Sequence, residues 1–127
     1  QSDLVDLVEA AIDGRLDTTG AQWDPRPSLG VVMAAAPYPD TPRTGDVIAG
    51  LDDVPAMAKV FHAGTALDAE GRVVSAGGRV LCVAALGESV SDAQRNAYAG
   101  VAKVRWTNEF HRTDIGWRAI ARERADA

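Results

Sequence analysis

Cysteine, aromatic residues and long apolar runs are all scarce in this sequence. Cys82 is the single cysteine among 127 residues, which excludes an internal disulfide framework and fits the reducing cytoplasm. It lies inside an apolar run, where a cysteine is usually a small buried hydrophobe, and its neighbours offer nothing to activate a thiolate. No run approaches the roughly eighteen apolar residues of a membrane helix, and the N-terminus lacks a signal-peptide pattern, so no membrane partner is expected.

Positive charge is also in deficit. The 13 Lys and Arg residues face 18 Asp and Glu residues, for a net charge of −5 at pH 7. The average field repels nucleic-acid phosphates, so no nucleic-acid partner is expected, although a local basic patch can still bind one small anion. Phosphate-cradling P-loops, Gly-x-Gly-x-x-Gly motifs and catalytic triads are missing as well, so the sequence predicts neither a complete ATP site nor a catalytic residue. No Cys, Asp or Glu cluster accompanies His62 and His111, so no metal ligands are predicted.

The residues that are present predict one α+β domain. Hydrophobic residues make up 46% of the chain and charged residues 24%, as in globular proteins. Apolar periodicity predicts helices over 3–13, 90–103 and 117–124, and strands over 28–36, 47–50, 57–67, 72–76 and 79–86, with a short strand and turn within 106–114. We expect the strands to form a small barrel-sandwich hybrid over 28–124, with the helices packed outside.

The ends of the predicted elements carry recognisable signals. Ser2 and Ser89 are the expected N-caps of the first two helices, and Gly14 is the expected stop of the first. The residues 68–71 predict a hairpin turn. The segment 18–27 is polar and proline-containing, so it reads as a connector. We expect residues 1–17 to belong to a neighbouring unit, because the chain opens directly into a helix without a methionine and so looks like a piece of a larger protein.

The candidate site is built from glycines and arginines. Gly77 and Gly78 precede Arg79 at the head of the strongest predicted strand, and a bare backbone beside a guanidinium can bind an oxyanion. Arg112 and Arg118 flank a turn that leads into the last helix. Structural alternatives stay open: Arg79 can be a solvated strand end with a salt bridge, and Arg112 and Arg118 can be solvated side chains that bind nothing.

Two further residues complete the candidate set. His62 lies on a predicted strand shortly before Gly64, and most strand histidines have structural roles. Asp114 lies between Arg112 and Arg118, where it can orient an arginine or simply cap the last helix. We expect the guanidinium groups of at least two of Arg79, Arg112 and Arg118 to face one shared concavity.

Several ordered motifs resemble the C-terminal domain of phosphoribosylamine–glycine ligase, also called glycinamide ribonucleotide synthetase, an ATP-grasp family. The similarity spans about residues 28–120. It rests on Gly30-Val-Val-Met-Ala34, Tyr38-Pro39, Val47-Ile-Ala-Gly-Leu51, Lys59-Val-Phe-His-Ala-Gly-Thr65, Gly77-Gly-Arg-Val-Leu81, Ala85-Leu-Gly87 and Arg112-Thr-Asp-Ile-Gly-Trp-Arg-Ala119.

This resemblance implies an enzyme that joins glycine to 5-phosphoribosylamine with ATP and Mg²⁺ in purine biosynthesis. In the family the ATP-grasp lobes and the magnesium-holding carboxylates lie upstream, so this piece is expected to bind no cofactor and to be inactive alone. By the same resemblance, Arg79, Arg112 and Arg118 would position the ribose phosphate or the acyl phosphate. His62, Gly64, Gly77 and Gly78 would shape the same wall, with Asp114 orienting an arginine.

The alternative interpretation is a stand-alone, non-catalytic module that binds an anion or a protein. The first helix discriminates between the two interpretations. A buried apolar stripe on this helix favours an autonomous module, whereas an exposed stripe indicates a missing neighbour.

Overall fold

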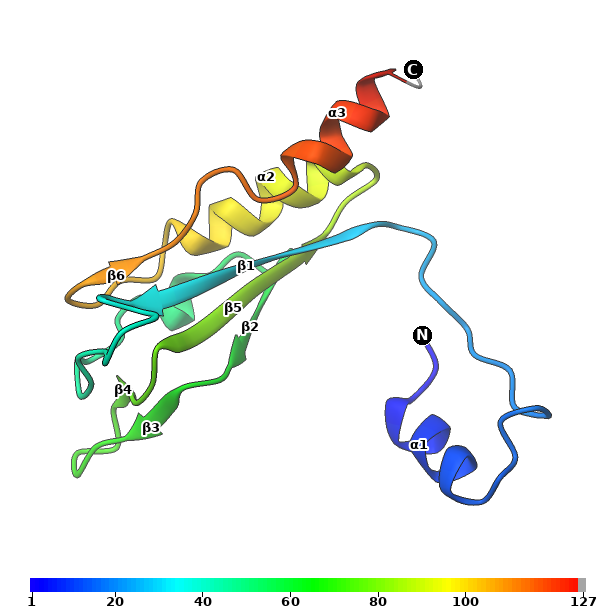
Figure 1. Cartoon of the computed structure of the whole chain (residues 1–127), viewed down its shortest axis with the longest axis horizontal. Helices are drawn as coiled ribbons and strands as arrows, with labels where there is room; N and C mark the ends of the chain where they lie inside the picture. The colour runs from blue at the N-terminus through cyan, green and yellow to red at the C-terminus, as the bar shows by residue number, and fades with distance from the viewer. Residues whose placement is uncertain (126–127) are drawn as a thin grey trace.

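The computed structural model describes residues 1–125 and consists of three α-helices and six β-strands (Figure 1). Their order is α1 (Leu4–Ile12), β1 (Ser28–Ala35), a short 3₁₀ turn (Leu51–Asp53), β2 (Ala58–His62), β3 (Thr65–Leu67), β4 (Val73–Ser75), β5 (Arg79–Leu86), α2 (Val90–Val101), β6 (Glu109–Phe110) and α3 (Trp117–Ala125).

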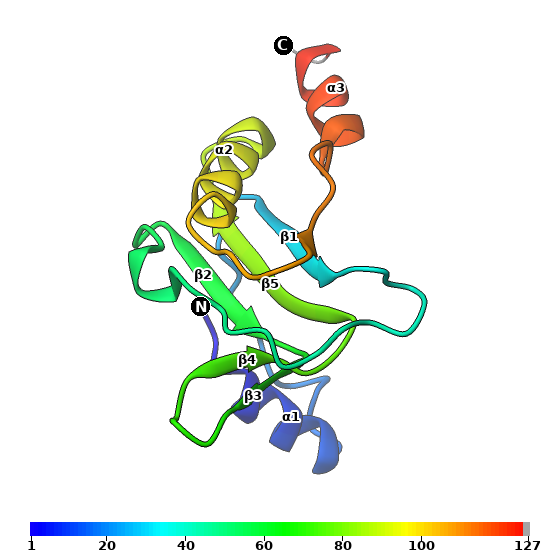
Figure 2. The ribbon, with the colours of Figure 1, turned by 90° about the vertical axis from the view of Figure 1, so that its left-hand side faces the viewer.

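The strands form two antiparallel sheets, so the α+β class expected from the sequence is confirmed. One sheet has the order β2-β5-β1-β6, and β3 pairs with β4 in a separate two-stranded hairpin (Figure 2). Across residues 1–125 these sheets do not close into a barrel, because β2 and β6 are opposite edges of the larger sheet. The domain is therefore an open sheet extended by a hairpin.

The core lies between the larger sheet and α2. Residues of β1 alternate between exposed and buried positions until Met33, as expected for a strand with one covered face. Helix α2 packs on this face and contributes Ala93, Ala97, Gly100 and Val101, all buried. The small side chains let α2 approach closely: a Cβ on Gly100 would lie 2.8 Å from a methyl group of Val83. The packing of α2 on the sheet is therefore a product of its small residues.

The second face of the sheet has no covering helix in residues 1–125. Val32, Cys82 and Phe61 are aligned in register across β1, β5 and β2. Val32 and Phe61 are 44% and 53% exposed. Burial raises the pKa of the half-buried Cys82 thiol, which keeps it protonated near neutral pH. Cys82 is therefore half-buried on an apolar face that is open to solvent, not buried in the core as expected.

Side-chain caps explain where the first two helices begin. The hydroxyl of Ser89 accepts a hydrogen bond from the Asp92 amide, as the sequence predicts. The prediction for Ser2 is wrong: the α1 cap is Asp3, whose carboxylate accepts from the Val5 amide. The hydroxyl of Ser2 instead accepts from the Gln22 amide, which ties the start of the chain to the connector.

Two predicted strands differ from those in the structure. The strand expected over 57–67 is interrupted at Ala63 and Gly64, between β2, which pairs with β5, and β3, which pairs with β4. The strand expected over 47–50 is reduced to isolated bridges at Val47 and Ala49. Local alternation is present over 47–50, but no continuous partner strand lies beside that segment.

Candidate functional site

Two stretches of backbone meet at one end of the larger sheet and form what we call the glycine corner, Gly64, Gly77 and Gly78. Gly64 donates its N–H to the carbonyl of Arg79 at 3.0 Å and accepts from the Ala76 amide at 2.7 Å. A Cβ on Gly64 would lie 2.7 Å from the Arg79 carbonyl oxygen and 3.0 Å from the Gly77 Cα. Gly64 is therefore required by the close approach of two backbones.

Tyr38 from the loop after β1 covers Gly78. A Cβ on Gly78 would lie 2.4 Å from Cδ2 of the Tyr38 ring. The tyrosine hydroxyl accepts a hydrogen bond from Nη1 of Arg79 at 3.3 Å, and the guanidinium carbon is 5.9 Å from the ring centroid. Gly78 thus provides space for an aromatic ring that contacts the neighbouring arginine.

A β-bulge sets the direction of Arg79. Met33 pairs with Leu81 and Ala34 pairs with Arg79, so Val80 is an extra residue on β5. Val80 and Leu81 are consequently both buried, while Arg79 is exposed. Bulges re-aim side chains in this way at the ends of strands. No ion pair to Arg79 is found among residues 1–125.

His62 lies at the end of β2, shortly before the glycine corner. Its Nδ1 is 3.1 Å from the Thr65 hydroxyl, and its side chain is exposed. Within residues 1–125, no group of three His, Cys, Asp or Glu side chains is arranged to hold a metal ion. His62, Gly64, Gly77, Gly78 and Arg79 are thus brought into one region of the fold.

Arg112 and Asp114 pair with each other in the loop before α3. Nε and Nη2 of Arg112 donate to the two carboxylate oxygens of Asp114 at 2.9 and 2.6 Å. The side-chain hydrogen bonds from Arg112 lower the pKa of Asp114, so this carboxylate stays ionised at lower pH than an ordinary aspartate. Tyr98 of α2 fixes the loop: its hydroxyl donates to the Arg112 carbonyl at 2.6 Å and accepts from the Ile115 amide at 3.2 Å.

A shallow pocket of about 320 Å³ lies at the start of α3 and is lined by Arg112, Asp114, Arg118 and Arg122 among others. Arg118 stacks on Trp117, with its guanidinium carbon 5.2 Å from the ring centroid. Two of the three arginines expected to share a concavity thus line one pocket. Arg79 does not line it, since it opens β5 at the end of the sheet near β3 and β4, whereas α3 lies beyond the opposite end (Figure 1).

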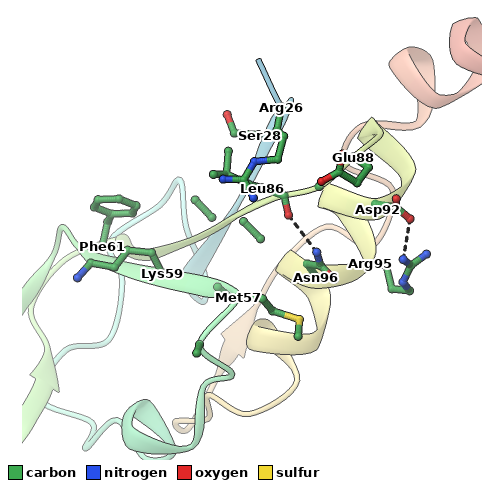
Figure 3. Close-up of a pocket in the computed structure, with 15 residues that line it drawn as sticks. Arg26, Ser28, Met57, Lys59, Phe61, Leu86, Glu88, Asp92, Arg95 and Asn96 are labelled. Atoms are coloured by element: carbon green, nitrogen blue, oxygen red, sulfur yellow. Dashed lines mark hydrogen bonds and ion pairs between the residues drawn. The ribbon is translucent and has the colours of Figure 1, made fainter. Parts of the chain in front are cut away.

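The sequence interpretation missed a larger pocket of about 840 Å³ between β2, β5 and the start of α2 (Figure 3). The pocket is lined by Met57, Phe61, Leu86, Arg26 and Asp92 among others. None of the site residues predicted from the sequence lines it. Its two arginines already have carboxylate partners, Arg26 with Asp24 and Arg95 with Asp92. The pocket combines connector, strand and helix, so no local sequence pattern could have indicated it.

These features define the class: an α+β domain with an open antiparallel sheet, one exposed arginine at the start of β5 and two more at the start of α3. Residues 28–118 match the sequence family described as "Phosphoribosylglycinamide synthetase, C domain", and the chain belongs to this family. No helix among residues 1–125 has the length and apolarity needed to cross a bilayer.

Relatives and a solved structure are similar over nearly the whole chain. The chain is 78% identical over 124 residues to the phosphoribosylamine–glycine ligase of Xanthomonas axonopodis pv. citri, covering 98% of this chain and 29% of that protein. It is 59% identical over 126 residues to the ligase of Allochromatium vinosum, with coverage of 98% and 29%. The crystal structure of the Thermotoga maritima ligase aligns with a TM-score of 0.69 at 34% identity, covering 86% of this chain and 27% of that one. The chain therefore spans under a third of the length of these proteins.

Proposed function

We propose that this chain is the C-terminal part of a cytoplasmic ligase that joins glycine to 5-phosphoribosylamine in purine biosynthesis. The observation that supports this most is the 78% identity over 98% of the chain to a protein named phosphoribosylamine–glycine ligase. The chain corresponds to 29% of that protein, so the activity is proposed for a longer protein that contains this domain.

ATP and Mg²⁺ are the proposed cofactors of that longer protein, as the family resemblance implies. Among residues 1–125, no group of three His, Cys, Asp or Glu side chains is arranged to hold a metal ion. By the same family resemblance, the magnesium ligands and the ATP site are proposed to lie in the rest of the longer protein. The proposed partners of this domain are those neighbouring ATP-grasp domains and the small substrates.

The glycine corner is the proposed wall for the phosphate of 5-phosphoribosylamine. Arg79 is exposed, is held by an aromatic residue and lacks a carboxylate partner among residues 1–125, so its charge is available to an anion. A guanidinium fork matches the geometry of phosphate oxygens. His62, Gly77 and Gly78 shape the surroundings of this arginine.

Arg112 and Arg118 form a second proposed contact, with Asp114 as the residue that orients Arg112. Their pocket lies apart from Arg79, which favours a different part of the substrates or a neighbouring domain. The carboxylate of Asp114 already occupies two donors of Arg112, so Arg118 is the freer cation of the two. Arg79 is therefore the principal candidate for the substrate phosphate.

Residues 1–17 are proposed to pack against a neighbouring domain of the longer protein, with 18–27 as the connector. Along this part of the chain the large apolar side chains are solvent-exposed, for example 73% at Leu4 and 79% at Ile12. Such a stripe gains about 1.5–3 kcal/mol for each large side chain that becomes fully buried. An exposed stripe of this kind favours the ligase over the autonomous module.

Replacing Ile12 by lysine tests whether this helix packs against a neighbouring domain or stays exposed to solvent. In the 127-residue chain we expect the free energy of unfolding to change by less than about 0.5 kcal/mol, because Ile12 is exposed. In the longer ligase the same change should lower the thermal unfolding midpoint by several degrees, because the lysine would enter an apolar contact. An unchanged midpoint in the longer protein would refute the packing.

The function itself is tested by measuring ADP formation in the longer ligase. We expect turnover that requires both glycine and 5-phosphoribosylamine, and no turnover by the 127-residue chain alone. Turnover by the 127-residue chain, or ADP formation that ignores either substrate, would contradict the proposal. Ribose 5-phosphate binding without any turnover in the longer protein would instead favour the stand-alone anion-binding module.

A further inference from the structure

Tyr38 and Arg79 are 41 residues apart in sequence and meet at the glycine corner. The guanidinium contacts the tyrosine in two ways, through the 3.3 Å hydrogen bond to the hydroxyl and through its position 5.9 Å from the ring centroid. A cation within about 6 Å of an aromatic centroid is attracted by the ring quadrupole. The tyrosine therefore restricts where the charge of Arg79 can lie.

The loop that carries the ring is held in place by backbone hydrogen bonds. Ala35 donates its N–H to the Gly78 carbonyl at 2.9 Å, and the Tyr38 amide donates to the Ala35 carbonyl at 3.0 Å. Ala36 donates to the carbonyl of Asn108 at 2.9 Å. The bare Cα of Gly78 then supplies the space that the ring occupies, because any Cβ there would overlap Cδ2. The loop, the glycine and the ring form one fitted contact.

Arg79 contacts a tyrosine, whereas most arginines of the chain contact a carboxylate. Arg26, Arg72, Arg95 and Arg112 each contact a carboxylate within 3 Å. A carboxylate neutralises the cation and occupies its donors, whereas a phenol orients the group and leaves its full charge. Arg79 is thus both oriented and unneutralised, which is the state that anion binding requires.

We infer that Tyr38 is a positioning residue for Arg79, holding its guanidinium against the Tyr38 ring and hydroxyl so that the remaining N–H donors face an incoming phosphate group. This inference rests on the proposed function for its ligand. The contact between the two side chains does not depend on that function, so the two can be tested separately. Tyr38 acts through Arg79 and needs no contact with the substrate itself.

The kinetic test uses Tyr38→Phe, Tyr38→Ala, Arg79→Ala and the Tyr38→Ala/Arg79→Ala pair in the longer ligase. We expect Tyr38→Phe to raise the KM for 5-phosphoribosylamine about 2–3-fold and Tyr38→Ala about 10-fold, with the KM for glycine unchanged. In the Arg79→Ala background, Tyr38→Ala should add nothing. Leu67→Ala, which truncates an exposed side chain of the nearby hairpin, is the matched control. An equal effect of Tyr38→Ala in both backgrounds would overturn the inference.

A nuclear magnetic resonance test on the 127-residue chain separates the inference from the proposed function. Tyr38→Phe should shift the Nε–H resonance of Arg79 and lower its ¹⁵N order parameter, while the signals of Arg72 stay unchanged. If these changes appear but Arg79→Ala leaves the KM for 5-phosphoribosylamine unaltered, the positioning stands and the phosphate role fails. An Arg79 Nε–H resonance that is identical in Tyr38→Phe and the parent chain would overturn the positioning role.

Discussion

Replacing Gly50 by alanine is expected to destabilise the domain by about 3–5 kcal/mol. Gly50 has a φ of +80°, and a Cβ there would lie 2.0 Å from the carbonyl oxygen of Lys103. The left-handed conformation alone costs an L-residue roughly 1–2 kcal/mol. The overlap is with backbone, which cannot rotate away, so the segments must separate.

That separation would disrupt the contact between the loop and the end of α2. Ala49 and Arg105 exchange two backbone hydrogen bonds of 2.8 and 3.1 Å beside Gly50, and each is worth about 1 kcal/mol. Val104, which is fully buried, lies in the same segment. The strain, the lost hydrogen bonds and the loosened core together account for the expected magnitude.

The measurement is urea unfolding, monitored by tryptophan fluorescence. Trp106 is buried and follows Arg105 directly in the sequence, so its fluorescence reports on this contact. Gly45→Ala is the matched control: Gly45 has a φ of +87°, but nothing lies within 4 Å of its built Cβ. Gly45→Ala should therefore show only the conformational cost. If both variants lose the same free energy of unfolding, the Lys103 backbone moves aside easily and the expected overlap has no cost.

Arg79→Ala in the longer ligase is expected to raise the KM for 5-phosphoribosylamine about 10–100-fold. Charge-assisted hydrogen bonds contribute roughly 1.5–3 kcal/mol, which corresponds to this range. The side chain is exposed, so its loss should leave the thermal unfolding midpoint nearly unchanged. Arg79→Lys keeps the charge without the planar fork and should give an intermediate KM.

Arg72→Ala is the control for general effects of charge. Arg72 is exposed on the neighbouring hairpin and already contacts Asp68 at 2.7 Å and Glu70 at 3.2 Å, so its charge is neutralised locally. We expect its KM to stay within about 2-fold of the parent value. The role assigned to Arg79 fails if both variants change the KM equally, or if neither does.

Local sequence signals account for most of the secondary structure. The apolar run over 79–86 coincides with β5, and the Ser89 cap begins α2 where expected, because both depend on residues close in sequence. The Ser2 cap was wrong because Asp3 offers a stronger acceptor one residue later. The strand expected over 57–67 was too long because its two halves pair with different strands, β2 with β5 and β3 with β4, and this pairing is not visible in the local sequence.

The candidate site was predictable as a list of residues but not as an arrangement. The glycines and Arg79 stand out in the sequence because glycine frees the backbone and arginine carries a permanent charge. Tyr38 contributes to the family resemblance through Tyr38-Pro39, but a tyrosine between two prolines gives no indication of a role in the site. Its role emerges only where the loop after β1 meets β5.

The sequence by itself determined the α+β class, the family and the charged residues available for binding, because periodicity, composition and ordered motifs are properties of neighbouring residues. Only the tertiary structure decided which of the candidate arginines pair with a carboxylate and which do not. Asp114 forms an ion pair with Arg112, whereas Tyr38 orients Arg79 without neutralising its charge. Partner choice depends on contacts between segments tens of residues apart, and those contacts exist only after the chain has folded.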